Sequence, residues 1–300
     1  MKRRICVAGD GAWGRALAFA AREAGHDTRM WSRRAPDDAA LSDAEVIVGA
    51  VPAQSVREVV TRLAFKEGTP LIIAAKGIER ETGKLMSDVV RDVRPDAPCL
   101  ALSGPSFAED VVKGLPTAVV LAGNEELAEE WASALARPQF RIYRSGDLTG
   151  VEYGGALKNV LAIACGISDG RGFGESARAA LITRGFAELE RMGRALGAKP
   201  ETLRGLSGFG DLILTCTSGK SRNHAFGLAI GGGVGVGAAL AASKGVVEGA
   251  YTAGIAHRKA RGLGIDMPIV AAIRAIVDDG SDPETEIEKL LARRAGLEDE

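Results

Sequence analysis

The sequence predicts two domains of different class: an α/β N-terminal domain with a doubly wound sheet over residues 1–146, and an all-α C-terminal domain over residues 147–300. Three observations support this. Short apolar runs that are typical of buried parallel strands alternate with helical patterns in the first half. A glycine-rich turn follows the first of these runs. After residue 146 the alternation stops, and long helical patterns follow one another.

Composition narrows the class of protein. The chain has 300 residues, 46% hydrophobic content and a formal net charge of -1, which is typical of a globular protein and does not favour nucleic acid as a partner. No apolar run is long enough to span a membrane. The cysteines are far apart and form no metal-binding pattern, so we expect no metal site and a reducing, cytoplasmic location.

The first predicted strand, Ile5–Ala8, runs into Gly9-Asp10-Gly11-Ala12-Trp13-Gly14 and then into a helix predicted from about residue 15 to 24. GxGxxG between a strand and a helix binds the pyrophosphate of a dinucleotide in Rossmann-like domains. Gly9 would allow the tight turn, Gly11 would let the phosphates approach the backbone, and Gly14 would let the helix pack closely on the strand. A glycine-rich turn without a ligand is the alternative.

The second predicted strand, Thr28–Trp31, ends in Ser32-Arg33-Arg34. An acid at this position holds the ribose 2′-hydroxyl of NAD, whereas arginine accommodates the 2′-phosphate of NADP. We therefore predict NADP(H) as the preferred cofactor, with NAD(H) still usable, and Arg33 as the contact. Trp13 or Trp31 would pack against the cofactor. An exposed basic turn is the alternative.

The remaining strands are predicted at 46–51, 71–75, 99–102, 117–121 and 140–143, with helices at 55–63, 81–93 and 125–135. Parallel sheets bind ligands beyond the carboxyl ends of their strands, so the residues after each run are candidates. Lys76 would hold an anion and depress the pKa of a neighbouring lysine. Ser106, beside Gly104, opens a predicted helix that would receive a phosphate or carboxylate. An exposed loop charge and a plain N-cap are the alternatives.

The helical half is organised around Val151–Asp169. Its large apolar residues recur at helical spacing, so one side is predicted to pack into a core. Lys158 lies on another face together with the small residues Gly155 and Ala162. A lysine in such a hollow loses solvation, which lowers its pKa and suits a proton acceptor near neutral pH. A solvated or snorkelling lysine is the alternative.

Two later segments add polar candidates. Asp211 lies between a glycine-rich turn and an apolar run, where an isolated carboxylate needs a cation, and we predict Lys158 as its partner. Ser221-Arg222-Asn223 places a guanidinium and an amide at a predicted helix start, which is a good phosphate receptor. A surface arginine after an N-cap is the alternative.

The other features of this half are predicted to be structural. Ser176 would cap a helix running to Leu196, with Glu188 paired to Arg184 on its solvent side. Residues 231–237 form a predicted mobile, glycine-rich loop. Glu248 would either bond the cofactor or merely begin a helix.

With these pieces in place, the chain resembles the bacterial NAD(P)-dependent sn-glycerol-3-phosphate dehydrogenases over nearly its whole length. The stretches that carry the resemblance are 9–14, 103–109, 151–159, 178–185, 206–218 and 221–223. The resemblance implies that Lys158 is the proton acceptor, with Lys76 and Asp211 in the active site. It further implies a substrate-binding set of Lys76, Gly104, Ser106, Lys158, Asp211, Ser221, Arg222 and Asn223. The implied dinucleotide contacts are Gly9, Gly11, Trp13, Gly14, Arg33, Lys76, Ala108, Arg222 and Glu248.

The implied reaction is the reversible oxidation of sn-glycerol 3-phosphate, a small phosphorylated substrate, to dihydroxyacetone phosphate. In the reductive direction it would supply glycerol 3-phosphate for phospholipid synthesis. The sequence departs from the family pattern at Asp10 and Arg15, where a small residue and threonine are usual. Residues 34–45 are also too short for the helix and third strand expected there. A β-hydroxyacid or ketopantoate-type dehydrogenase and a non-catalytic NADPH sensor are the alternatives, and a homodimer stays open.

Overall fold

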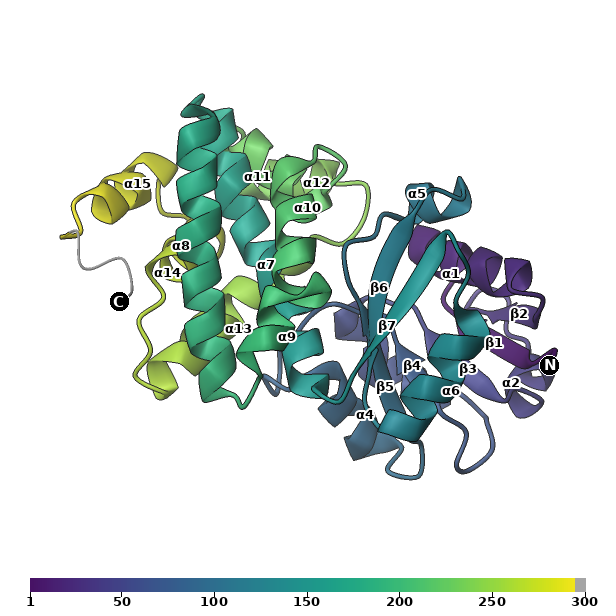
Figure 1. Ribbon diagram of the computed structural model, residues 1–300. Helices are drawn as coiled ribbons and strands as arrows, with labels where there is room; N and C mark the ends of the chain where they lie inside the picture. Colours follow the sequence, from purple (N-terminus) through teal and green to yellow (C-terminus); the bar gives the residue numbers. More distant parts are fainter. Residues whose placement is uncertain (295–300) are drawn as a thin grey trace.

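A computed structural model describes residues 1–294 (Figure 1). One half of the molecule consists of a twisted sheet and the helices that cover it, and the other half consists of helices. The sheet has the order β2-β1-β3-β4-β5-β6-β7. Its strands are β1 (Arg4–Ala8), β2 (Asp27–Trp31), β3 (Val46–Gly49), β4 (Leu71–Ile73), β5 (Cys99–Ser103), β6 (Thr117–Ala122) and β7 (Phe140–Ser145).

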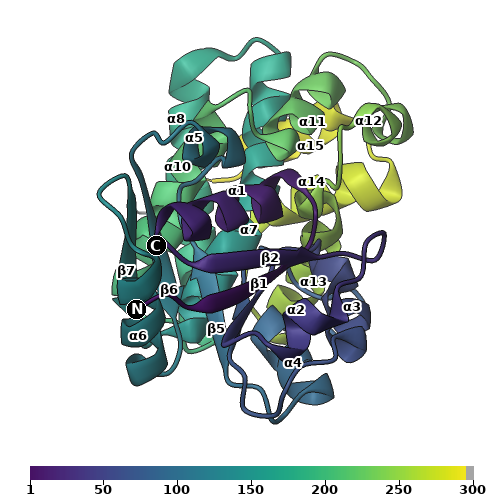
Figure 2. The same cartoon turned by 90° about the vertical axis from the view of Figure 1, so that its right-hand side faces the viewer.

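Helices cover both faces of the sheet, which confirms the doubly wound prediction. Alternate residues of β1 enter two different cores: Ile5 and Val7 pack on one side, Cys6 and Ala8 on the other. Figure 2 shows α1 on one face and α2, α3 and α4 on the opposite face. The first core is covered by α1 (Ala12–Glu23), α5 (Ala108–Val112) and α6 (Glu125–Leu135), and the second by α2 (Asp38–Ser42), α3 (Val56–Arg62) and α4 (Met86–Val93).

The predicted parallel pairing is confirmed between all neighbouring strands of the sheet except one pair. β6 pairs antiparallel to β5, whereas the other neighbouring strands are parallel. A parallel neighbour needs a crossover, usually through a helix that runs back along the sheet. The five-residue α5 is too short for that return, so β6 runs back directly beside β5.

The helical half surrounds one long helix, α7 (Leu148–Gly170). The prediction that the apolar side of this helix packs into a core is confirmed, and its other faces are covered as well, because every residue from Gly150 to Ser168 is buried. Its many glycines and alanines let neighbours approach on all sides. These elements are α8 (Gly174–Ala195), α9 (Pro200–Arg204), the π-helical turn η2 (Leu206–Gly210), α10 (Asp211–Thr217), α11 (Arg222–Gly231), α12 (Val236–Ala242), α13 (Glu248–Gly262), α14 (Pro268–Asp279) and α15 (Pro283–Leu291).

The structure changes class between Ser145, where β7 ends, and Leu148, where α7 begins. The division at residue 146 stays a prediction about folding units, and residues 295–300 of its second part lie outside the described residues. Within residues 1–294, no helix combines the length and apolar character needed to cross a membrane.

Several local predictions are wrong. α8 begins at Gly174 with Phe173 at its N-cap, so Ser176 lies inside the helix. Glu188 is buried rather than on the solvent side, because its carboxylate accepts hydrogen bonds from the backbone N–H groups of Ile269 and Val270 at the start of α14. The loop predicted at 231–237 is shorter than expected and comprises residues 232–235, because α11 includes residue 231 and α12 begins at residue 236.

Candidate active site

Three predicted catalytic residues meet where α7 lies against the sheet. Lys158 Nζ donates to Asp211 Oδ1 at 2.5 Å, and Lys76 Nζ donates to Asp211 Oδ2 at 2.7 Å. Each carboxylate oxygen therefore binds one lysine. Lys158 Nζ also donates to Thr215 Oγ1 at 2.7 Å, and Lys76 Nζ to the Gly104 carbonyl at 2.9 Å. Asp211 is fully buried, so the two ammonium groups supply the cations that its burial requires.

Local packing explains how Asp211 reaches α7. The turn η2 crosses α7 at Gly154, where a Cβ atom would lie only 2.9 Å from the Gly208 Cα atom. Glycine at this crossing lets the two backbones touch, and α10 then begins at Asp211 directly beside α7. Thr215 lies four residues later on the same face of α10. The sequence analysis missed Thr215, although its i,i+4 spacing from Asp211 was a usable indication.

Burial is the largest single effect on the pKa values of Lys158 and Asp211. It lowers the pKa of Lys158 to about 8, while the charge of Asp211 raises it and the charge of Lys76 lowers it. For Asp211, burial acts to raise the pKa, but the charges of Lys158 and Lys76 outweigh it and hold this pKa below its ordinary value. The site thus joins an ionised carboxylate to a lysine that can lose its proton near neutral pH.

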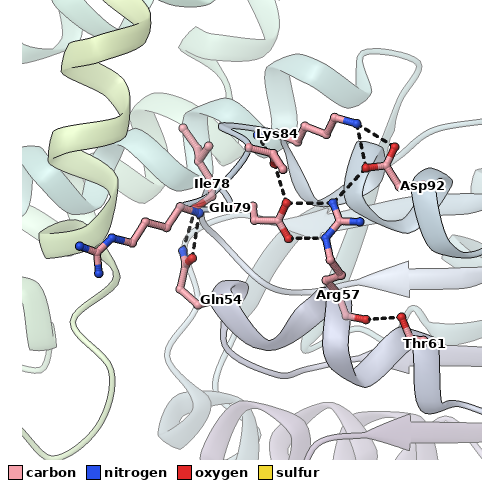
Figure 3. Close-up of polar contacts among 9 residues, drawn as sticks. Gln54, Arg57, Thr61, Ile78, Glu79, Lys84 and Asp92 are labelled. Atoms are coloured by element: carbon pink, nitrogen blue, oxygen red, sulfur yellow. Dashed lines mark hydrogen bonds and ion pairs between the residues drawn. The ribbon is translucent and has the colours of Figure 1, made fainter.

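A polar cluster fixes the loop that carries Lys76 (Figure 3). Gln54 donates from Nε2 to the Ile78 carbonyl at 2.8 Å. Arg57 of α3 binds both oxygens of Glu79, at 2.8 and 2.9 Å. The loop then turns at residues 80–82 and folds back to a bridge between Ile78 and Leu85, so the helix predicted from residue 81 begins only at residue 86, as α4. Because Gln54, just before α3, and Arg57 of α3 both hold the residues that follow Lys76, this side chain projects from a fixed base.

Asn159, the residue after Lys158, takes part in a chain of hydrogen bonds that connects three helices. Its Oδ1 accepts from Asn223 Nδ2 at 2.9 Å, and Asn223 Oδ1 accepts from the Gly249 N–H at 2.9 Å. The predicted substrate residue Asn223 thus has its amide bonded to protein groups, and it links α11 to α7 and α13. The sequence analysis did not single out Asn159, because its partner is distant in sequence.

The start of α11 carries the other predicted phosphate ligands. Ser221 is buried and caps this helix, since its Oγ accepts from the His224 N–H at 3.2 Å. Arg222 is exposed, and its NH1 atom would be 2.8 Å from a Cβ atom at Gly245. Glycine at residue 245 therefore leaves room for the guanidinium.

Glu248 both begins α13 and reaches the sheet. Its Oε1 accepts from the Ala53 N–H at 3.1 Å, just after β3. Its Oε2 is buried without a hydrogen-bond partner in the described part of the chain. Burial raises the pKa of Glu248, and the charge of Arg222 opposes this. An orphaned carboxylate oxygen at this edge is available to a donor group of a ligand.

The glycine-rich loop has the geometry that its motif predicts. Gly9 has φ 130°, and a Cβ atom there would lie 2.4 Å from the Ala50 carbonyl oxygen. A Cβ atom at Gly14 would lie 2.1 Å from the Gly9 carbonyl oxygen, whereas Gly11 has open space beside it. Trp13 is partly exposed near this loop. Trp31 is buried in the core below α2 and α3, so the prediction that it packs on a cofactor is wrong.

The loop after β5 differs from its prediction. Ser106 Oγ donates to the Gly104 carbonyl at 3.0 Å, and α5 begins two residues later, at Ala108, with Phe107 at its N-cap. Ser106 therefore does not open the helix, because its hydroxyl is engaged within the turn. The same carbonyl accepts from Lys76, which places this loop beside Asp211.

Comparisons with known proteins cover almost the whole chain. The family model described as NAD-dependent glycerol-3-phosphate dehydrogenase C-terminus matches residues 147–288, and the N-terminus model matches residues 4–39 and 35–129. A glycerol-3-phosphate dehydrogenase [NAD(P)+] of Mesorhizobium japonicum is 47% identical over 97% of this chain and 92% of its own length. One from Brucella ovis is 43% identical, with complete coverage of both chains. The crystal structure of glycerol-3-phosphate dehydrogenase from Coxiella burnetii superposes with a TM-score of 0.92 at 37% identity, over 97% of this chain and 99% of that one.

The chain belongs to the NAD-dependent glycerol-3-phosphate dehydrogenase family. It is a short member, because the Brucella ovis alignment spans 331 positions and this chain has 300 residues. The two segments of the N-terminal match meet at residues 35–39. There the structure has a tight turn and the five-residue α2 between β2 and β3, and within the described residues β2 is an edge strand. The prediction that this stretch is too short for a further strand is confirmed, whereas the prediction that it is also too short for a helix is wrong, because α2 lies within it.

Proposed function

We propose that this chain catalyses the reversible NAD(P)-dependent oxidation of sn-glycerol 3-phosphate to dihydroxyacetone phosphate. One observation supports this most strongly: Lys158 and Lys76 bind opposite oxygens of the buried Asp211 beside the carboxyl edge of the sheet. Proton-transfer groups therefore lie where a doubly wound fold binds its dinucleotide. The substrate is the one after which the full-length relatives, glycerol-3-phosphate dehydrogenases, are named.

The residues present fit a dinucleotide. Gly9 and Gly14 allow a turn so tight that any side chain would strike backbone, and Gly11 leaves an open approach to the phosphates. The orphaned Oε2 of Glu248 lies on the same edge. Arg33 favours NADP(H), with NAD(H) also used. When bound, the nicotinamide ring accepts or returns the hydride of the reaction.

The protein groups move the proton. Neutral Lys158 accepts the proton of the C2 hydroxyl during oxidation, and its ammonium form returns a proton to the carbonyl oxygen during reduction. Asp211 and Thr215 hold Nζ in position through the two hydrogen bonds described above. Lys76 stabilises negative charge that develops on the substrate oxygen.

The phosphate of the substrate is bound by the start of α11. Arg222 offers an exposed guanidinium, and the first turn of the ten-residue helix adds backbone N–H groups. Ser221 and Asn223 hold this end of the helix in place through their own hydrogen bonds. Gripping the phosphate positions C2 beside Lys158.

Two finer expectations belong with this function. We place the enzyme in the cytoplasm, where it supplies glycerol 3-phosphate for phospholipid synthesis and where Cys165 and Cys216 stay reduced. A homodimer is the expected assembly, and light scattering on the purified chain would measure it.

The test is a cofactor-absorbance assay with dihydroxyacetone phosphate, comparing the wild type with Lys158→Ala. General acid–base catalysis is worth about 10²- to 10⁴-fold, so we expect kcat to fall by about that factor. Circular dichroism checks that the variant keeps its fold. Near-normal turnover by Lys158→Ala would exclude the assigned role. Binding of NADPH by the wild type without turnover would favour the non-catalytic sensor instead.

A further inference from the structure

Arg33 and Glu58 form an ion pair across the carboxyl edge of the sheet. Arg33 NH1 lies 3.4 Å from Glu58 Oε2. Arg33 is at the tip of the turn that follows β2, and Glu58 is in the first turn of α3, which follows β3. Because β1 lies between β2 and β3, the pair is next to the strand that carries the glycine-rich loop.

The turn that holds Arg33 is rigid. The backbone N–H of Ser32 donates to the Ala35 carbonyl at 3.2 Å, and the N–H of Ala35 returns a bond to the Ser32 carbonyl at 3.1 Å. Ser32 Oγ also accepts from the Ala35 N–H at 3.2 Å. Arg33 thus projects from a four-residue turn closed by hydrogen bonds. Its guanidinium can change position only by rotation about the bonds of the side chain, because the backbone is held.

A dinucleotide whose pyrophosphate lies on the Gly9–Gly14 loop places its adenosine ribose at the end of β2. Arg33 then attracts a 2′-phosphate, whereas the carboxylate of Glu58 competes with that phosphate for the same guanidinium. We propose that Glu58 is a specificity-determining residue, which weakens the preference for a 2′-phosphorylated dinucleotide by pairing with Arg33. This inference rests on the proposed NAD(P)-dependent function.

The exposure of the pair sets the size of the effect. The side chains of Arg33 and Glu58 are 55% and 47% exposed, so solvent screens their attraction. Arg33 therefore loses little free energy when it exchanges the Glu58 carboxylate for a phosphate. Glu58 has a second partner, because Arg62 NH2 lies 3.2 Å from its Oε1. Glu58 therefore stays on this face of α3 when Arg33 turns to a ligand.

The experiment measures kcat/KM for NADPH and for NADH with dihydroxyacetone phosphate in wild type, Glu58→Gln, Arg33→Ala and the double variant. We expect Glu58→Gln to raise the NADPH/NADH ratio by roughly two- to fivefold, as for a surface ion pair. Arg33→Ala should lower the ratio by about tenfold or more, because a charge-assisted bond to phosphate is lost. In the Arg33→Ala background, Glu58→Gln should no longer raise the ratio by this amount.

Glu23→Gln is the matched control. Glu23 is 53% exposed and pairs with Arg137 at 3.2 Å, at the far end of α1, so its loss should leave the ratio unchanged. The inference is overturned if Glu58→Gln leaves the ratio of an active enzyme unchanged, or raises it equally without Arg33. Failure of the proposed function gives a different result, in which the wild type turns over neither cofactor.

Discussion

At the scale of single residues, the sequence predicted a lysine beside a carboxylate but not the balance of the effects on the pKa of that lysine. Small neighbours on one face of a helix predicted that Lys158 loses solvation, and Asp211 was the partner predicted for it; in the structure Lys158 is buried and bonded to Asp211. The sequence left open whether Asp211 or Lys76 decides the pKa of Lys158. In the structure burial acts most strongly, and the two charges oppose each other. Thr215 was missed because its contact with Lys158 crosses between helices.

The opposed charges predict opposite shifts in the pH dependence of glycerol 3-phosphate oxidation. Oxidation needs neutral Lys158, so kcat should rise with pH through an apparent pKa near 8. Asp211→Asn removes a charge that raises this pKa, so the profile should move to lower pH, by about one unit. Lys76→Met removes a charge that lowers the pKa, so the profile should move to higher pH.

Both variants should also lose at least about tenfold in kcat, because each removes a group that positions or stabilises the reacting atoms. Thr215→Ser keeps the hydroxyl that binds Lys158 Nζ and should retain the wild-type profile. If Asp211→Asn and Lys76→Met shift the profile in the same direction, the titrating group is not Lys158.

At the scale of elements, the strands were predictable and the role of the helical glycines was not. α7 and α11 cross through four glycines at which a Cβ atom would overlap the backbone of the other helix: Gly166, Gly170, Gly227 and Gly231. From the sequence, residue 231 was assigned to a mobile loop, because glycine is more common in turns than inside helices. The glycine crossing holds the start of α11, with Arg222, at a fixed distance from Lys158.

Gly227→Ala should therefore damage both stability and activity. The added Cβ would lie 2.1 Å from the Ile163 carbonyl oxygen, and both backbones would have to separate. Overpacking of this kind costs about 1–3 kcal/mol, measurable by urea unfolding. The shifted α11 should also lower kcat/KM for dihydroxyacetone phosphate.

Gly237→Ala in α12 is the control, because nothing lies within 4 Å of its Cβ position and alanine favours a helix. Its free energy of unfolding should be unchanged or increased. Equal stability of the Gly227 and Gly237 variants would contradict a tight crossing of α7 and α11.

At the scale of the whole molecule, the change from an α/β half to a helical half was evident from the sequence, whereas the contacts between the halves were not. Direction within the sheet depends on how a connection closes in space, so the antiparallel β6 was missed. Glu152 of α7 is a second example. Its carboxylate accepts from the N–H and Oγ of Ser87 in α4, at 2.8 and 2.5 Å, across 65 residues of sequence.

This buried contact predicts how stability depends on pH. Burial raises the pKa of Glu152 from an ordinary 4.5 to about 7, and the hydrogen bonds from Ser87 partly oppose this. Between these two values the folded state holds a proton that the unfolded chain has released, so the free energy of unfolding should fall as pH rises from about 4.5 to 7. The loss is about 3 kcal/mol and is complete above that range.

Glu152→Gln removes the titrating group, so its free energy of unfolding should decline less steeply over this range than that of the wild type. Ser87→Ala acts in the opposite direction, because it removes a bond that lowers the pKa of Glu152 and so extends the decline to higher pH. Urea unfolding at a series of pH values measures both slopes. Glu152 joins α7 to α4. A flattened slope in Glu152→Gln together with an extended decline in Ser87→Ala would therefore assign the pH dependence to the contact between the two halves. Parallel curves for the wild type and both variants would rule out this assignment.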